Sequence, residues 1–398
     1  RLMILVFFSL FISTVFPKTT LYVQYSRKSN NFETVQEAVN MAASINPRGE
    51  HERVTINIAP GLYREQVIIN TPFITLKNGQ PSKGTVTITW YYGMGYKYYS
   101  ANSSGYYDAD LAKKRSSKKT VSNWGATVQL WKKAKYFKAS NIIFENSFNR
   151  YMTTEEIRDG VTVNRDSLSS TINFQRIPSS NVRTREATER AAAITIEGAY
   201  TEFLSCRFYS SQNTLYTGVS PIFFKKCIIE GQTDYIFGTG NVVFDFCELR
   251  WKGYSGTSYP GYITSTKIGG GESISSYTGY LFNKCRIYGS TQNLNVTSGY
   301  LGRASSYTAK VTFINTFLLD DKIIFPEGWY QMNGIKPEDV DGFKEYGTQL
   351  KDGTLIDVSF RKGQIVSSEF ARTLKKIKYL NYWSPSYLNS YIQWYYIF

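Results

Sequence analysis

Two short polar stretches carry the side chains best suited to chemistry. The stretch SSQNTLYTG, residues 210–218, holds the amide pair Gln212 and Asn213 and ends in small, turn-forming residues. The stretch GQTDYIFGTG, residues 231–240, also has a polar centre and ends in small, turn-forming residues, but its central polar group is the carboxylate of Asp234. Asp234 follows Asn213 by 21 residues. If the chain repeats at this interval, the two polar turns lie next to each other and form two sides of one site. Most hydrolytic sites built this way use two acids, whereas this one pairs an acid with an amide.

The charge of the chain points to an anionic partner. Among 398 residues, 46 Lys and Arg exceed 31 Asp and Glu, giving a net charge of +15. Such a field favours nucleic acid, acidic lipid or an acidic polysaccharide. The densest basic patch, AKKRSSKK at 112–119, does not resemble a nucleic-acid-binding arm, so we expect no nucleic-acid partner. The single histidine, His51, and four cysteines without a CxxC pair argue against a metal site, and no cofactor is expected.

The first 18 residues, RLMILVFFSLFISTVFPK, have one basic residue followed by a short apolar run. This run is too short for a comfortable membrane span and is typical of a secretory signal. We therefore expect a secreted protein that has no membrane association once residues 1–18 are removed.

A small element recurs along the chain, with Phe three residues before a small residue. The central copies are 21 and 20 residues apart, and the later ones 38 and 31, as expected where loops are inserted. Short strands at an interval of about twenty residues indicate one coil per repeat. The pattern predicts an all-β fold over residues 19–350, a single-stranded right-handed parallel β-helix with buried Phe and Cys ladders. The copies are FKAS, FLSC, FKKC, FDFC, FNKC and FINT, which begin at Phe137, Phe203, Phe224, Phe244, Phe282 and Phe313.

The cysteines of this repeat leave two alternatives. Cys206, Cys227 and Cys247 are expected about one strand spacing, ~4.8 Å, apart, which lies within the Cα range of a disulfide. Equivalent positions in stacked parallel strands point the same way, however, which favours buried thiols. A Cys206–Cys227 disulfide is the alternative in an oxidising compartment, and the sequence leaves the pairing of Cys285 open.

Three segments lie outside the repeat. Residues 30–45 have helical spacing of apolar residues and are expected to cap the open end of the coil. The Tyr-rich residues 90–124 form either a flap over a groove or a packing loop. Residues 351–398 are predicted to run back along the outside of the coil and cover it with aromatic side chains.

Five motifs resemble the pectin methylesterases (pectinesterases), in order and at roughly the family's spacing over about residues 20–348. They are GLYREQV, SSQNTLYTG, IIEGQTDYIFGTGNVVFDFCEL, YLGRAS and FPEGWYQM. The resemblance implies a right-handed parallel β-helix with long loops over its groove, which agrees with the repeat. It also implies metal-free hydrolysis of galacturonate methyl esters in pectin, by a monomer. The helix–strand opening and the Tyr-rich insertion look more like microbial members than plant ones.

The resemblance implies roles for individual residues. Asp234 matches the nucleophile that forms an acyl-enzyme, and Gln212 matches the amide that donates to the developing oxyanion. Arg303 matches the arginine that holds the nucleophile's carboxylate. Taken alone, Asp234 would suit a turn carboxylate and Gln212 a packing amide.

Further residues are implied to bind substrate. Tyr235 and Phe237 flank the nucleophile, and Trp329 matches an aromatic residue that lines the sugar groove, although simple packing is equally compatible with the sequence. Arg190 stands where many members have glutamine, and it would donate to an oxyanion or hold a galacturonate carboxylate.

Two other positions depart from the family. Asn213 occupies the place of the second aspartate, which protonates departing methanol and then activates water. Ala304 and Ser305 replace a Pro-Trp pair and remove one stacking surface. An amide donates a hydrogen bond but does not exchange a proton at neutral pH, and loss of general acid–base catalysis typically costs about 10²–10⁴-fold in rate.

Three hypotheses follow. The first is a slower pectin methylesterase, in which water or another acid such as Glu230 or Asp245 serves in place of the missing aspartate. The second is a pectin-binding homologue with little turnover. The third is an esterase for another ester, whose leaving group needs no protonation. Polysaccharide lyases and galacturonan hydrolases fit worse, because neither a calcium-binding carboxylate cluster nor grouped aspartates are visible.

Overall fold

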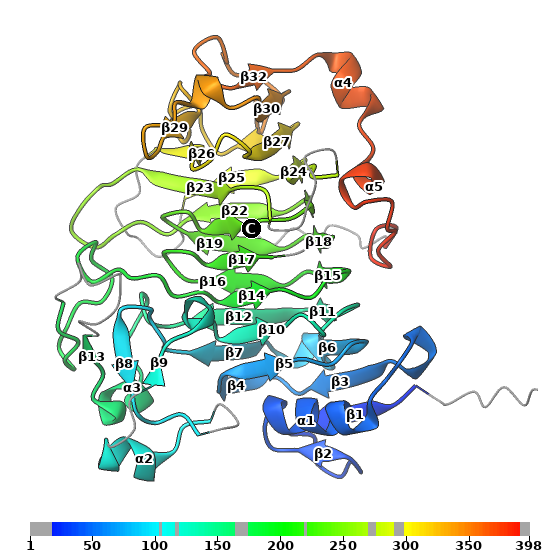
Figure 1. Ribbon diagram of the computed structural model, residues 1–398, viewed down its shortest axis with the longest axis vertical. Helices are drawn as coiled ribbons and strands as arrows, with labels where there is room; N and C mark the ends of the chain where they lie inside the picture. The colour runs from blue at the N-terminus through cyan, green and yellow to red at the C-terminus, as the bar shows by residue number, and fades with distance from the viewer. Residues whose placement is uncertain are drawn as a thin grey trace, which may run out of the picture.

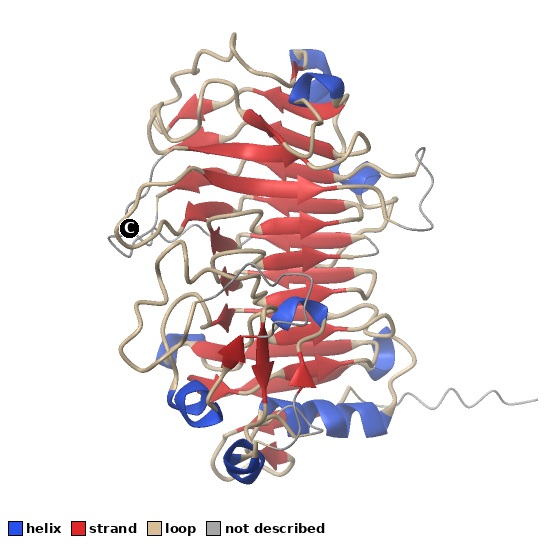
Figure 2. Ribbon diagram, turned by 60° about the vertical axis from the view of Figure 1, so that its left-hand side comes forward, coloured by secondary structure: helices blue, strands red, loops and turns tan. Residues whose placement is uncertain are grey.

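The computed structural model describes residues 18–102, 106–115, 119–163, 174–218, 221–269, 276–289 and 298–390. Apart from Lys18, the expected signal segment lies outside these ranges. Three long parallel sheets are stacked along the molecule, and each turn of the chain adds one strand to each sheet in succession (Figures 1 and 2). This arrangement confirms the predicted parallel β-helix.

The first sheet has 12 strands. In spatial order they are β2 (Asn31–Phe32), β1 (Thr20–Val23), β3 (Val54–Ile58), β6 (Ile74–Asn78), β11 (Lys138–Ser140), β15 (Thr201–Leu204), β18 (Ile222–Lys225), β21 (Val242–Asp245), β24 (Tyr280–Asn283), β27 (Lys310–Ile314), β30 (Gly342–Tyr346) and β32 (Gln364–Ile365).

The second sheet has 9 strands and the third has 8. The second comprises β31 (Gln349–Leu350), β28 (Phe317–Leu318), β25 (Arg286–Tyr288), β22 (Glu248–Trp251), β19 (Ile228–Gly231), β16 (Arg207–Tyr209), β12 (Ile142–Asn146), β7 (Val86–Trp90) and β4 (Gly61–Arg64). The third comprises β29 (Trp329–Gln331), β26 (Gly299–Ala304), β23 (Gly261–Thr266), β20 (Ile236–Gly238), β17 (Leu215–Thr217), β14 (Ile194–Ile196), β10 (Val128–Leu130) and β5 (Val67–Ile69).

Helices are few and short. They are α1 (Val35–Ile45), α2 (Ala109–Lys114), α3 (Thr154–Asp159), α4 (Ser368–Thr373) and α5 (Lys376–Tyr379), with 3₁₀ turns at Glu50–Glu52, Pro81–Lys83, Asn123–Gly125 and Pro337–Asp339. Within the described ranges, none of these helices has the length and apolar character needed to cross a bilayer.

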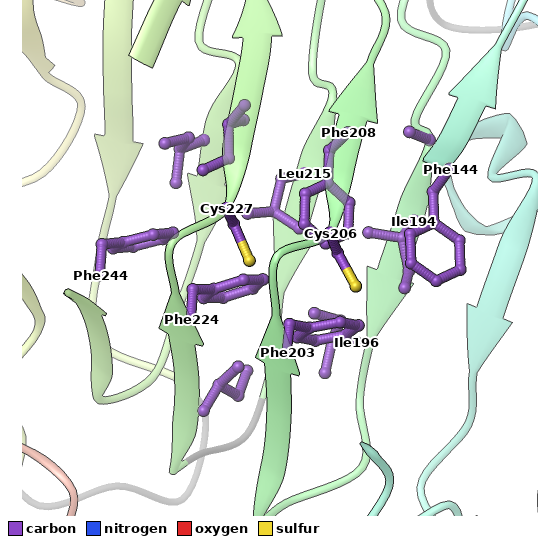
Figure 3. Packing of buried hydrophobic residues seen from close by; sticks show 14 of the residues in the cluster. Phe144, Ile194, Ile196, Phe203, Cys206, Phe208, Leu215, Phe224, Cys227 and Phe244 are labelled. Carbon is purple, nitrogen blue, oxygen red and sulfur yellow. The ribbon is translucent and has the colours of Figure 1, made fainter. Parts of the chain in front are cut away.

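A ladder of stacked phenylalanine rings runs through the core, as the repeat predicted (Figure 3). Ring centroids are 4.9 Å apart between Phe203 and Phe224, and 4.8 Å between Phe224 and Phe244. The stack continues through Phe282 to Phe313 at 4.5 and 4.3 Å. The predicted first rung is wrong: Ala139, not Phe137, pairs with Phe203, so FKAS lies two residues out of register with the other copies.

The cysteine ladder consists of free thiols. Cys206, Cys227, Cys247 and Cys285 are all buried and unbridged, and Figure 3 shows the Cys206 and Cys227 sulfurs pointing the same way. Parallel in-register stacking therefore excludes the alternative Cys206–Cys227 bond. Burial raises the pKa of Cys206 to about 12, which makes its thiol unreactive at neutral pH.

The capping helix begins five residues later than the first residue of the expected segment. Thr34 and Glu37 form a capping box, while Asn31 and Phe32 pair with β1 as a short strand. The buried carboxylate of Glu65, from the next coil, accepts hydrogen bonds from the backbone N–H groups of Val35 and Gln36, both at 2.9 Å. Glu65 thereby fixes the helix to the first coils through two donors that the helix itself leaves unsatisfied.

The first part of the Tyr-rich insertion, residues 90–101, packs into a buried cluster and does not form a flap. Trp90, Tyr91, Tyr96 and Tyr98 are buried in a cluster of their own, beside a three-stranded antiparallel sheet of β13 (Thr162–Val163), β8 and β9 (Tyr96–Tyr98 and Lys119–Thr120). These elements and helices α2 and α3 lie to one side of the stack (Figure 1). The aromatic residues therefore stabilise the insertion itself.

The C-terminal segment lies against the outer face of the first sheet (Figure 1). Leu380 packs in a buried cluster with Phe223, Val243, Leu281 and Ile314 from consecutive strands. Two buried carboxylates of the same face are also partnered by this segment: Asp245 by Lys376 at 2.9 Å and Glu202 by the Ser386 hydroxyl at 2.7 Å. The segment thus covers apolar and charged groups that would otherwise face water.

We predict that Leu380→Ala lowers the free energy of unfolding by about 2–5 kcal/mol, because it leaves a cavity between the C-terminal segment and the first sheet. Leu355→Ala is the matched control. Its side chain is 69% exposed, so the change should stay within about 0.5 kcal/mol. Equal effects in denaturant titrations of the two variants would contradict the packing described for Leu380.

Glu65 should make stability depend on pH. Burial raises its pKa from 4.5 to about 7. Between these values the folded protein keeps a proton on Glu65 that the unfolded chain has released, so this group's contribution to stability decreases as pH rises from about 4.5 to about 7. Glu65→Gln should remove this part of the slope, measured as the difference in unfolding free energy between the variant and the wild type. The same slope in both proteins would show that Glu65 titrates normally.

Candidate active site

The two polar stretches stack at one corner of the coil, between the second and third sheets. Asn213 and Asp234 occupy this corner in successive turns, and both have left-handed backbone conformations with φ of 58° and 45°. Asn and Asp tolerate this conformation better than most residues. The backbone N–H of Asn213 donates to the Thr233 carbonyl at 3.1 Å, and its side-chain amide donates to the Asp234 carbonyl at 3.4 Å. The two polar stretches, residues 210–218 and 231–240, are therefore adjacent, as predicted.

Arg303 reaches the Asp234 carboxylate from strand β26. Its Nε donates to Oδ1 at 2.8 Å, and a terminal nitrogen donates to Oδ2, which makes the pair bidentate. The Tyr262 ring lies against the guanidinium, 4.6 Å from its carbon. The arginine is thus held between a carboxylate and an aromatic face, and both carboxylate oxygens are oriented.

Burial dominates the electrostatics of Asp234. Its side chain is only 10% exposed, and this burial raises the pKa of the carboxyl, while the Arg303 guanidinium works in the opposite direction. A carboxylate with little hydration and a raised pKa is more basic than a surface aspartate, provided that the arginine keeps it ionised. The corner therefore presents a carboxylate suited to nucleophilic attack.

Gln212 and Arg190 continue the same corner, one coil and two coils before Asp234 respectively. Arg190, Gln212 and Thr233 are consecutive partners in parallel bridges. The Arg190 Nε donates to the Glu189 carboxylate at 3.1 Å, and its guanidinium lies 5.7 Å from the Trp124 ring. The Arg190 side chain is 29% exposed, so a cation and a half-buried amide lie on the same corner in the coils that precede the carboxylate.

Aromatic residues flank the Asp234–Arg303 pair on both sides. On one side, Phe237 contacts Trp124 and Tyr216, with ring centroids 4.9 and 5.2 Å apart. On the other, Tyr262, Tyr300 and Tyr330 form a second group, in which Tyr262 and Tyr300 are stacked at 5.6 Å and Tyr330 lies 5.0 Å from Tyr300.

Sequence reasoning missed all of these aromatic residues except Phe237. A signal for two of them exists in GYITST and GYLGRA, whose Gly-Tyr pairs occupy equivalent places in paired strands. Glu189, which positions Arg190, was also missed, because a buried carboxylate next to an arginine in sequence has no distinctive pattern.

Two predicted substrate-binding residues lie in the core. The Trp329 side chain is stacked on Phe343 at 4.1 Å, and Tyr235 packs edge-on against Trp251 at 5.6 Å; the two residues are 2% and 0% exposed. Trp329 pairs with Gly302, so the outward positions belong to the next pair, Arg303 and Tyr330. The groove-lining role expected for Trp329 and the substrate-binding role expected for Tyr235 are therefore wrong, and Tyr330 takes the outward place expected for Trp329.

The two alternative acids are engaged elsewhere. The Glu230 carboxylate pairs with Arg150 at 2.6 Å on the second sheet, and the Asp245 carboxylate pairs with Lys376 on the outer face of the first sheet. Neither replaces the missing aspartate at position 213. Among the residues with described positions, no group of three or more His, Cys, Asp or Glu side chains is arranged to hold a metal ion.

Comparison with known proteins supports the family resemblance. The family model described as Pectinesterase matches residues 169–357, a range that contains Gln212, Asp234 and Arg303. Probable pectinesterase 50 of Arabidopsis thaliana is 28% identical over 301 residues, which cover 75% of this chain but only 62% of that protein.

Solved structures show the same fold. The pectin methylesterase of Aspergillus niger has a TM-score of 0.61 at 23% identity, and covers 92% of this chain and 94% of its own. The carrot pectin methylesterase has a TM-score of 0.60 at 20% identity, with 89% and 90% covered. The chain is therefore similar in sequence to the pectinesterases over residues 169–357, and it shares its fold with solved pectin methylesterases.

Proposed function

We propose that the chain is a secreted esterase that hydrolyses galacturonate methyl esters in pectin, with Asp234 as its nucleophile and with turnover limited by Asn213. The observation that carries this proposal is the buried Asp234 carboxylate, held by Arg303 in a bidentate pair beside Gln212. In the same proposal, residues 19–350 form the catalytic domain, and the segment from 351 to the C-terminus serves as its outer cover.

In the first step, one Asp234 oxygen attacks the ester carbonyl carbon. The carbonyl π electrons move to the oxygen, and the Gln212 amide donates to the resulting oxyanion, an interaction worth about 3 kcal/mol where such donors have been removed. Collapse of the tetrahedral intermediate breaks the bond to the methoxy oxygen and leaves an acyl-enzyme on Asp234. The departing methoxide must take up one proton to become methanol.

In the second step, water attacks the acyl carbon and releases the galacturonate carboxyl and the Asp234 carboxylate. This water must lose a proton during attack. Asn213 stands where the resemblance implies an aspartate for both proton transfers, and its amide supplies hydrogen bonds only. Protons therefore come from and return to solvent, which slows the release of a poor leaving group such as methoxide.

Substrate contacts follow from the surroundings of the pair. The exposed part of Arg190 suits a neighbouring galacturonate carboxylate, since guanidinium groups bind carboxylates with directed hydrogen bonds. The outward Tyr330 is 39% exposed and offers an apolar face next to Arg303, whereas Phe237 is buried against Trp124 and Tyr216. Sugar rings would bind along this line of outward residues.

The amide at position 213 also favours two related functions. A pectin-binding homologue would keep the cation and aromatic groups but release little methanol. An esterase for aryl esters would use the same nucleophile, because a phenolate leaves without protonation. The ratio of aryl-ester to methyl-ester hydrolysis separates these functions from a methylesterase.

We predict that Asn213→Asp raises methanol release from methylesterified pectin by about 10²–10⁴-fold, because it restores a group that exchanges protons. Asp is accommodated at this left-handed position as readily as Asn, so the backbone should be unaffected. Asp234→Ala should abolish release in both backgrounds. An unchanged rate in Asn213→Asp would show that position 213 does not limit turnover.

We further predict that Arg303→Gln shifts the acidic limb of the pH–rate profile to higher pH. Burial already raises the pKa of Asp234, and the guanidinium opposes that rise, so its removal leaves the carboxyl protonated over more of the acidic range. Arg250→Gln is the matched control, because both arginine side chains are 21% exposed and paired with a carboxylate. An acidic limb that stays in place or moves to lower pH in Arg303→Gln would refute the role given to the pair.

A further inference from the structure

A second corner of the coil, between the first and second sheets, carries a row of residues in left-handed backbone conformation. One residue per coil has φ between 52° and 56°, and the row is Asn141, Ser205, Lys226, Phe246, Lys284 and Asn315. This conformation is costly for side chains other than Gly, Asn and Asp. Asn suits the two ends of the row, whereas Phe246 and Lys284 lie near its middle against the backbone preference.

A cavity of about 380 Å³ opens at this part of the corner. Its lining combines two cations, two carboxamides and two aromatic rings, contributed by Phe246, Lys284, Arg286, Asn315, Phe317 and Gln349. The Lys284 ammonium lies 5.6 Å from the centre of the Phe246 ring. Phe246 and Lys284, which the left-handed conformation does not favour, thus supply one of the two rings and one of the two cations of the cavity.

Strand register places these six side chains in consecutive coils. Asp245, Asn283 and Ile314 are paired in sequence, so Phe246, Lys284 and Asn315, each the next residue, follow one another along the corner. Arg286, Phe317 and Gln349 are paired one after another in the adjacent strands of the second sheet. At about 4.8 Å per coil the lining extends roughly 14 Å along the axis, which suits a short chain of sugars better than a single small ion.

We infer that this corner cavity binds the acidic sugar units of a uronic-acid oligosaccharide. Lys284 and Arg286 would pair with the ligand's carboxylates, the amides of Asn315 and Gln349 with its hydroxyls, and the rings with its apolar faces. The net charge of +15 favours such an anionic chain. The choice of a uronic acid rests on the proposed function.

The cavity is distinct from the candidate active site. Strand β22 lies between the corner of Phe246 and the corner that carries Asp234 and Asn213, so the two are separated by about 13 Å of extended chain. A long galacturonan bound at this corner would be held to the protein independently of ester hydrolysis.

The test uses Phe246→Asn and Lys284→Asn, because asparagine suits the left-handed position and removes the ring or the charge. Trigalacturonate, which is unesterified and short, is titrated calorimetrically into the full chain. We expect two classes of site in the wild type, and each variant should weaken one class by at least about 10-fold, or 1.4 kcal/mol. Phe246→Asn should melt at the same or a higher temperature than the wild type.

Lys226→Asn is the matched control, with the same charge change at the same type of corner, outside the cavity lining. It should alter trigalacturonate binding by less than about 2-fold. An equal loss in Lys226→Asn would indicate diffuse attraction and overturn the proposal. Unchanged binding in both cavity variants, a marked drop in the melting temperature of Phe246→Asn, or equal competition by inorganic phosphate would also overturn it.

This experiment separates the two proposals. If the chain releases no methanol from pectin but retains the class of site sensitive to Lys284→Asn, the proposed ester hydrolysis fails and the cavity stands. If methanol is released at wild-type rates and neither cavity variant affects binding, the cavity fails and the hydrolysis stands.

Discussion

In-register stacking of parallel strands is the constraint on which the rest of the structure depends. Because each coil adds one strand to each of three sheets, a side chain lies directly beside its equivalent in the coils before and after it. The phenylalanine rings from Phe203 to Phe313 stack for this reason, and the four thiols remain unbridged because they point the same way. The same rule brings Asn213 beside Asp234, although 21 residues separate them.

The alternation of side chains across each strand decides what the site contains. Arg303 and Tyr330 are partners on the outward face, and their neighbours Gly302 and Trp329 are partners on the inward face. An aromatic side chain expected to touch a sugar is therefore a core residue, and the tyrosine after it takes the outward place. Of the tyrosines on the outward face, Tyr300 and Tyr330 remain partly exposed, whereas Tyr262 is buried against the Arg303 guanidinium.

In the candidate site, the positions of the side chains and the capacity for proton transfer depend on different features of the chain. The proposed nucleophile Asp234, its partner Arg303 and the proposed amide donor Gln212 depend on backbone position and charge, and the structure holds them in nearby coils. Proton transfer depends on the group that distinguishes Asn213 from an aspartate, namely an NH2 in place of a carboxylate oxygen. This amide does not titrate, whatever its position in the fold. Glu230 and Asp245, the two acids considered as replacements for an aspartate at position 213, form ion pairs elsewhere and are not available for this role. Under the proposed function, the chain would keep the Asp234–Arg303 pair and lack a titratable group at position 213.

The sequence by itself determined the β-helix, the phenylalanine ladder, the capping helix and the family resemblance, because each of these depends on local repeats or contiguous motifs. It also indicated that Asp234, Asn213, Gln212 and Arg303 belong together. Only the tertiary structure decided which face each side chain occupies, as for Trp329 and Tyr235, and which copy of the repeat is out of register, as for Phe137. A shift of one residue reverses the face of a strand without altering composition or spacing, so inward and outward positions were settled by pairing with distant strands.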